Sequence, residues 1–123
     1  MTKIKIFTTL IFMFLYLVQS ICSQALRNNG AYIFTTKKSF IRVNNLDVKN
    51  ESNGKIYINI GSEFNVKGNI YNTLSSFILR DSSVSVIDSN IVNAGNLFLN
   101  DTSKIWVKKN IINSGFIKNN YLI

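Results

Sequence analysis

Two consecutive stretches, SSFILRDSSVSVIDSNIVNA (75–94) and GNLFLNDTSKIWVKKNIINS (95–114), decide the fold because they are two copies of one pattern. A small residue opens each copy, and the pattern extends in both directions. The opening residues are Gly54, Ser75, Gly95 and Gly115, at intervals of 21, 20 and 20. A fixed period of this size is the signature of a stacked repeat architecture. We therefore predict a repeat over residues 54–123.

Within each unit the apolar residues alternate over three to five positions and then break at Gly, Asn, Asp or Ser. Proline is absent. Alternation with a period of two predicts strands, and these breakers predict turns. Each unit would hold about three strands, which in the third unit are 96–99, 104–108 and 110–112.

Two architectures fit such short strands, an antiparallel sandwich and a parallel β-solenoid. Only a solenoid stacks equivalent strands one rung apart, at about 4.8 Å, and so explains why like positions recur. The fold class predicted is all-β, a parallel β-helix of about four rungs of 20–21 residues after an N-terminal signal helix. The expected interior columns are Ile56–Phe77–Leu97–Ile117, Ile58–Leu79–Leu99 and Val66–Val86–Val107.

Asn72, Asn93 and Asn113 recur at one corner of successive units. Stacked amides can bond along the axis and satisfy backbone groups at a corner, as in the Asn ladders of cross-β stacks. The alternative is a compositional bias, because the chain is rich in Asn. Their equal spacing favours a ladder.

The N-terminus has the pattern of an export signal. Lys3 and Lys5 precede a run of mostly apolar residues from Ile6 to Val18, and 23–25 form a small-x-small cleavage site. Residues 1–25 are therefore predicted to be a signal peptide, with cleavage after Cys22 or Ser23 as alternatives. An uncleaved anchor and lipidation at Cys22 are also open.

Removal of residues 1–25 leaves one small domain, with 26–53 as an N-terminal capping rung and 54–123 as the repeats. Its only cysteine, Cys22, leaves with the signal, so packing and backbone pairing must stabilise the domain. Twelve basic and six acidic residues remain, a net charge of +6. The basic residues are dispersed, which fits solubility and protection of sheet edges or attraction to an anionic surface.

The stretches LRNNGAYIF (26–34), GNIYN (68–72) and NSGFI (113–117) resemble the N-terminal repeat region of secreted Bacteroidetes-type surface proteins. They are similar, more distantly, to the β-helical stalks of adhesins and autotransporter passengers. The resemblance implies an architecture rather than an activity, since these motifs are structural.

The composition gives little support for an enzyme. The chain has no histidine, so the commonest general base and metal ligand is missing. Asp81 and Asp101 occupy one corner of adjacent units and are the remaining candidates for catalysis or a calcium bridge. An Asp beside Ser or Thr at a turn more often bonds its own backbone. We expect no enzyme, no cofactor, no metal and no nucleic-acid partner.

The outward positions are the candidate contacts for a ligand or partner, because contiguous exposed apolar stripes mark contact surfaces. The alternative is an error of phase at one strand, since a slip of one residue inverts every side chain. The predicted contact residues are Tyr57, Ile78 and Phe98 in one column, Tyr71, Val92 and Ile112 in a second, and Trp106 on another face.

The first functional hypothesis is an exported, non-enzymatic β-solenoid, secreted or at the cell surface, that is structural or adhesin-like. The second is a small carbohydrate-binding module that stacks sugars on Tyr57, Phe98 and Trp106; a fragment of a longer polysaccharide-active β-helix protein is the third. Partners would be a glycan, a protein, or further copies bound through the solenoid ends. A membrane would be contacted only through an uncleaved signal segment.

Overall fold

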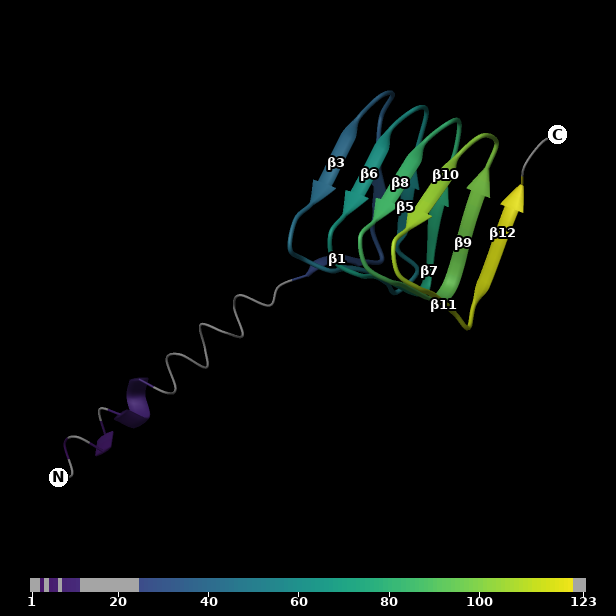
Figure 1. Cartoon of the computed structure of the whole chain (residues 1–123). Coiled ribbons are helices and arrows are strands. Elements are labelled where there is room, and N and C mark those ends of the chain that lie inside the picture. Colours follow the sequence, from purple (N-terminus) through teal and green to yellow (C-terminus); the bar gives the residue numbers. More distant parts are fainter. Residues whose placement is uncertain (1–2, 4, 7, 12–24, 121–123) are drawn as a thin grey trace.

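The protein is a parallel β-solenoid of about five turns (Figure 1). A computed structural model describes residues 3, 5–6, 8–11 and 25–120. The strands of the described chain are β1 (Leu26–Asn29), β2 (Tyr32–Phe34), β3 (Phe40–Val43), β4 (Val48–Glu51), β5 (Lys55–Ile58), β6 (Glu63–Val66), β7 (Ile70–Leu79), β8 (Val84–Ile87), β9 (Ile91–Asn100), β10 (Lys104–Val107), β11 (Ile111–Asn113) and β12 (Phe116–Asn120).

All of these strands pair in parallel and form two sheets. One sheet has eight strands, and its long strands β7 and β9 pair with each other. The first half of β7 also pairs with β4 and its second half with β5. The first half of β9 pairs with β11 and its second half with β12. The other sheet is four-stranded, in the order β10-β8-β6-β3. The three strands predicted for each unit are therefore merged to two in the middle rungs, where the chain bends between Thr73 and Ser76 without leaving the sheet.

The first turn of the stack is formed by β1, β2 and β3, whereas β4, which also lies within residues 26–53, already belongs to the second turn and pairs with β1. β1, β2 and β3 pair in register with β4, β5 and β6. The total of about five turns comprises this capping turn and about four repeat turns, and the capping turn repeats the later design at a longer spacing. Asn28 and Asn50, for example, are 22 residues apart.

Two of the three predicted core columns are confirmed. Ile56, Phe77, Leu97 and Ile117 pair in register, and so do Ile58, Leu79 and Leu99. Apart from Ile117 and Leu99, which lie near the end of the stack, these side chains are buried. Stacking of like side chains gives each rung the apolar surface that it cannot bury alone.

The third column is wrong at β8. Val66 pairs with Ile87, and Ile87 with Val107, whereas Val86 pairs with Asn65 and Trp106 and lies on the outer face. The turns that lead into β6, β8 and β10 have the same length, so no rung has an extra residue before these strands.

A buried serine explains why Val86 can face outward on β8. Ser85, fully buried, takes the inward position between Phe64 and Ile105. Its hydroxyl donates to the carbonyl oxygen of Phe64 at 2.9 Å, which satisfies a polar group that would otherwise be costly to bury.

The predicted asparagine ladder is confirmed and is longer than expected. Each side-chain Nδ2 donates to Oδ1 of the Asn one rung later, at 2.7–2.9 Å. The members are Asn28, Asn50, Asn72, Asn93 and Asn113. The first four are nearly or fully buried. The same amides donate to backbone carbonyls at the bend, such as Asn72 to the oxygen of Asn96 at 2.8 Å, so the ladder ties each corner to the next.

A second ladder lies at another corner and runs from Asp47 through Asn69 and Asn90 to Asn110. Here each Asn donates its backbone N–H and its Nδ2 to Oδ1 of the residue one rung earlier. The sequence analysis did not identify this column. Two of the corners are thus held by side-chain amides and not by disulfides.

Residues 3, 5–6 and 8–11 are helical. No helix among the described residues is long and apolar enough to cross a membrane. The predicted cleavage region 22–24 lies outside the described residues. The pairings of all twelve strands and both ladders join residues between Leu26 and Asn120, so this segment contains the interactions that define the solenoid.

Candidate functional site

An apolar column runs along the outer face of the eight-stranded sheet. Tyr57, Ile78 and Phe98 occupy one register position on β5, β7 and β9. Phe34 on β2 continues the column at one end, and Lys118 on β12 continues it at the other. Successive residues of a strand point to opposite faces, so these side chains lie opposite the buried core columns. The structure thus brings three of the predicted contact residues together.

Members of this outer column cover one another. Ile78 is only 7% exposed although it points away from the core, whereas Phe34 on the first rung is 64% exposed. Tyr57 and Phe98 flank Ile78 on the neighbouring rungs, and both are half-buried. The column is therefore a continuous apolar stripe whose middle is packed and whose first-rung end is open.

Two stacked rings with basic partners form the first-rung end of the stripe. The Tyr32 and Tyr57 ring centroids are 6.3 Å apart with an interplanar angle of 8°. Lys55 Nζ lies 5.1 Å from the Tyr32 centroid, and the Arg80 guanidinium lies 5.1 Å from the Tyr57 centroid. The hydrogen bond that the Lys55 ammonium donates to the Tyr32 side chain, and then the charge of Tyr32, raise the pKa of Lys55 above the ordinary value of 10.5. Both tyrosines thus hold cations against their rings.

An edge-to-face pair forms the other end. The Phe98 and Phe116 centroids are 6.0 Å apart with an interplanar angle of 61°, and Phe116 is 51% exposed. Sequence reasoning missed Tyr32, Phe34 and Phe116 as contributors to this surface. Extending the outward column by one rung would have found Phe34. Tyr32 and Phe116 lie at the neighbouring outward position, which they share with Lys55, Ser76 and Asn96.

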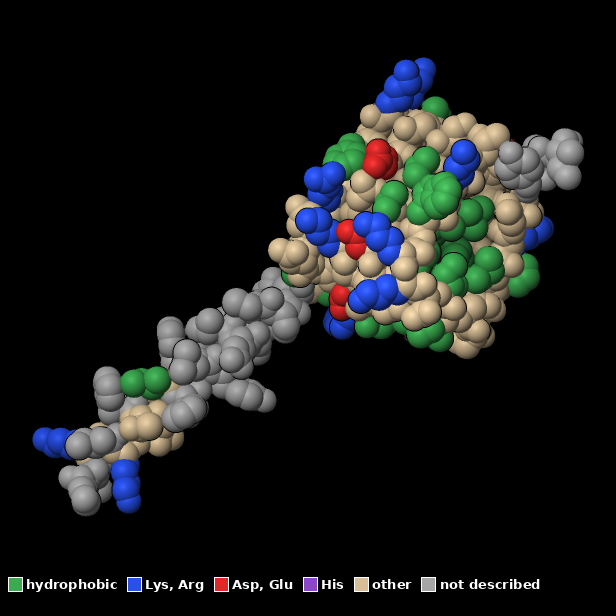
Figure 2. Space-filling model, viewed as in Figure 1, with side chains coloured by type: hydrophobic (Ala, Val, Ile, Leu, Met, Phe, Trp, Pro, Cys, Tyr) green, Lys and Arg blue, Asp and Glu red, His purple; other side chains and the backbone are tan. Residues whose placement is uncertain are grey.

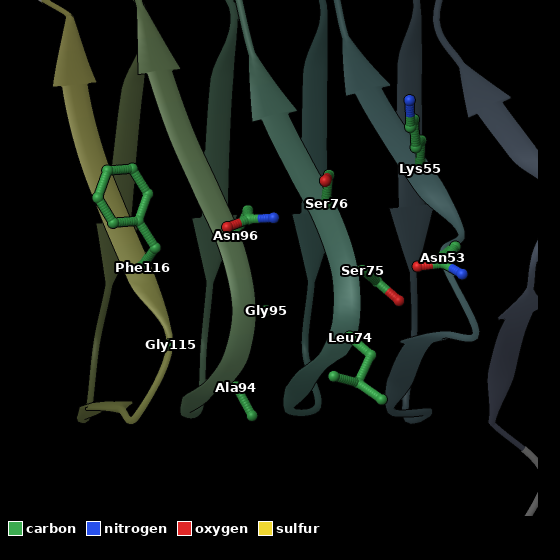
Figure 3. A pocket seen from close by; sticks show the side chains of 10 residues that line it. All are labelled: Asn53, Lys55, Leu74, Ser75, Ser76, Ala94, Gly95, Asn96, Gly115 and Phe116. Atoms are coloured by element: carbon green, nitrogen blue, oxygen red, sulfur yellow. The ribbon is translucent and has the colours of Figure 1, made fainter.

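A groove of about 450 Å³ runs along this face beside the stripe. Figure 3 shows side chains from successive strands along it. Its lining residues are Asn53, Lys55, Leu74, Ser75, Ser76, Ala94, Gly95, Asn96, Gly115 and Phe116. Lys55, Ser76, Asn96 and Phe116 share one register position, so the groove crosses the rungs. It offers an ammonium, a hydroxyl and an amide beside an exposed ring.

The floor of the groove is made of glycine for a packing reason. A Cβ on Gly95 would lie 2.3 Å from the carbonyl oxygen of Ser75, and one on Gly115 would lie 2.2 Å from the oxygen of Gly95. Such distances are far below van der Waals contact, so no other residue fits there without a shift of the backbone. The bends at Gly95 and Gly115 therefore each rest directly on the bend of the rung before.

The second predicted column, Tyr71, Val92 and Ile112, is also in register, on β7, β9 and β11. It lies on the other half of the long strands, before the bend. Tyr71 and Val92 are half-buried, and Ile112 on the last described rung is 56% exposed. Lys49 and Arg27 continue it toward the first rung, so this column is apolar at one end and basic at the other.

Trp106 lies on the four-stranded sheet and does not join the other aromatic candidates. It is 61% exposed and continues an outer column of Arg42, Asn65 and Val86. A smaller groove of about 250 Å³ lies along this sheet, lined in part by Arg42, Val86 and Asp88. On the side seen in Figure 2, hydrophobic side chains gather toward the C-terminal rungs, and charged ones toward the first rungs.

Asp81 and Asp101, the acidic candidates, both lie in turns with positive φ, 49° and 57°. That conformation is one that Asp tolerates better than most residues because its short side chain can bond locally. Among the described residues, no group of three or more His, Cys, Asp or Glu side chains could hold a metal ion.

No protein-family model, curated protein or solved structure matches the chain. The site consists of an amphipathic sheet face with exposed rings, two cations and a polar groove.

Proposed function

We propose that the chain is exported and acts as a non-enzymatic structural or adhesin-like element, secreted or at the cell surface. The observation that supports this most is the way the stack is braced. Columns of like side chains and two amide ladders hold the rungs, and residues 26–123 contain no cysteine. A solenoid held in this way needs neither a cofactor nor disulfide formation to remain folded outside a cell.

Export is tested by joining the full chain to a reporter enzyme that is active only after translocation. Activity is expected, together with a fragment beginning near residue 26 in mass spectrometry. Leu10→Arg with Ile11→Arg interrupts the apolar run and should retain the fusion inside the cell. A matched pair of substitutions on the solenoid surface, Thr36→Arg with Lys37→Arg, should leave export unchanged. Reporter activity that survives the first pair would contradict the signal.

Glycan binding is the second candidate function, because the stripe and the groove lie side by side on one face. Exposed rings can stack on the apolar faces of sugars, while Asn96, Ser76 and Lys55 beside them can bond hydroxyl groups. Tyr57 and Phe98 belong to this face, whereas Trp106 does not.

A glycan array with residues 26–123 tests this candidate. Tyr57→Ala and Phe98→Ala should each abolish a signal that arises on the eight-stranded sheet, and Trp106→Ala should leave it intact. Loss of binding only in Trp106→Ala would assign the glycan to the four-stranded sheet. Absence of any binding would leave the structural role as the remaining function.

A further inference from the structure

The two ends of the solenoid expose apolar side chains that the middle rungs cover. Exposed large hydrophobic side chains of the solenoid lie mainly at its two ends. On the first rung they are Leu26, Tyr32, Phe34 and Phe40, and at the opposite end Trp106, Ile111, Ile112, Phe116 and Ile117. In the described chain, β1, β2 and β3 each pair on one edge only, and so do β10, β11 and β12. Both ends therefore present free strand edges beside apolar surface, which is a template for further pairing.

The first asparagine ladder has a missing partner at one end and a matching donor at the other. Asn28 is 3% exposed, and its Oδ1 has no hydrogen-bond partner in the described structure. In every later member, Oδ1 accepts from the amide of the preceding rung. Asn113 Nδ2 on the last described rung donates only at 3.1 Å to the oxygen of Gly115. Nδ2 of Asn113 in one copy thus offers the hydrogen-bond donor that Oδ1 of Asn28 in another copy lacks.

We propose that the two ends bind each other in separate copies, with β11 and β12 of one copy pairing in parallel with β1 and β2 of the next. The register follows from the existing columns. Asn113 would lie against Asn28, and Ile111 against Leu26. In the core, Ile117 would continue onto Ile33, so apolar surface left open at both ends would be buried.

The charges of the two ends agree with this register. Lys118 would lie over Phe34, which sets a cation against a ring. Arg42 already lies 5.1 Å from the Phe40 ring centroid within one copy, so this kind of contact suits the first rung. The four-stranded sheet has one strand fewer than each half of the eight-stranded sheet, so β10 and β3 would lie two rungs apart and would not pair.

Contact between two different surfaces generates open chains of molecules when successive copies are stacked along one axis and cannot close into a ring. The assembly would be a rod that lengthens with protein concentration. This inference goes beyond the proposed function, since export and assembly can fail separately. A monomer that is still exported would overturn the inference alone.

The oligomeric state of residues 26–123 in solution tests the proposal, measured by analytical ultracentrifugation over a series of concentrations. The mean mass is expected to rise with concentration. Ile111→Lys with Ile117→Lys should reduce it to one monomer mass, while circular dichroism remains that of the parent. Ile60→Lys is the matched control, because Ile60 and Ile111 are both 47% exposed but Ile60 lies in a turn of a middle rung. A monomer at every concentration, or equal loss of assembly in the control, would overturn the proposal.

Cysteine pairs test the register independently, since residues 26–123 contain no cysteine. Arg27 and Ile112 share one column and would become neighbours across the junction. Arg27→Cys with Ile112→Cys should give covalent multimers on oxidation. Lys49→Cys with Ile112→Cys should not, because the two sites would be two rungs apart, at about 10 Å, beyond the roughly 7 Å limit between the Cα atoms of a disulfide. Efficient cross-linking by Ile112→Cys alone would instead indicate that like ends meet, and would contradict the head-to-tail arrangement.

Discussion

Asn50 donates its side-chain amide to Oδ1 of Asn72 at 2.8 Å, although 22 residues separate them in the chain. Both side chains are at most 1% exposed. A buried amide that lacks its partners is expensive, whereas one that has them fixes the geometry around it. This contact therefore sets the distance along the sequence at which the chain must return to the same corner.

Replacement of Asn72 by Ala removes an amide with partners on both sides. Asn50 loses its acceptor, and Asn93 loses the donor that now lies at 2.7 Å. We expect the free energy of unfolding to fall by about 3 kcal/mol, since several buried polar groups lose a partner at once. This loss is measured by urea denaturation, with unfolding monitored by circular dichroism. Asn113→Ala, at the exposed end of the same ladder, should cost less than about 1 kcal/mol; equal losses would contradict a ladder buried in its middle.

The phase of β8 is tested by two neighbouring residues. Ile87 is fully buried and Val86 is half-buried on the outer face. Ile87→Ala should lower the unfolding free energy by about 2–5 kcal/mol because it leaves a cavity in the core. Val86→Ala should lower it by less than about 1 kcal/mol. A larger loss for Val86→Ala than for Ile87→Ala in urea denaturation would mean that Val86 is the buried residue, as expected from the sequence.

The contact between successive bends is tested at Gly95. A methyl group there would lie 2.3 Å from the Ser75 carbonyl oxygen, so Gly95→Ala must push two rungs apart. The expected loss is about 1–3 kcal/mol, the usual range for overpacking, seen as a lower thermal midpoint. Ala94→Ser, at the exposed neighbouring position, serves as control and should change stability by no more than about 0.5 kcal/mol.

The pKa of Lys55 depends on Tyr32 and gives a prediction in pH. Tyr32 raises this pKa above 10.5, so the interaction favours the protonated, folded form. Its contribution to stability is complete below pH 10.5 and is lost as the pH rises through the pKa of the folded state. Tyr32→Phe should move the Lys55 pKa back toward 10.5 in an NMR titration of the side-chain carbons.

Tyr71→Phe is the matched control for that titration, because Tyr71 lies on the other outer column. It should leave the Lys55 titration unchanged. An unaltered midpoint in Tyr32→Phe would show that Tyr32 does not hold the ammonium group.

The period of about 20 residues was sufficient to predict the stacking, the columns through Phe77 and Leu79, and the ladder through Asn72. Those features depend only on which residues recur. The phase of β8 could not be predicted in this way, because Val84 and Val86 are more apolar than Ser85 and alternate as a buried pair would. Burial of Ser85 becomes sensible only when the Phe64 carbonyl oxygen is seen beside it.

The candidate site was predictable within a column but not between columns. Tyr57, Ile78 and Phe98 share a register position that spacing alone reveals. Whether Trp106 shares their face depends on how far each turn rotates the chain, and turns such as those at Asp81 and Asp101 use positive φ angles that the periodicity does not encode.

The opposite donor directions of the two ladders have an electrostatic consequence. From Asn28 to Asn113 each amide donates toward the later rung, and from Asn110 back to Asp47 each donates toward the earlier one. Aligned dipoles add along an axis, so two antiparallel files offset each other. The side-chain amides of the two ladders consequently contribute little net dipole along the axis of the rod.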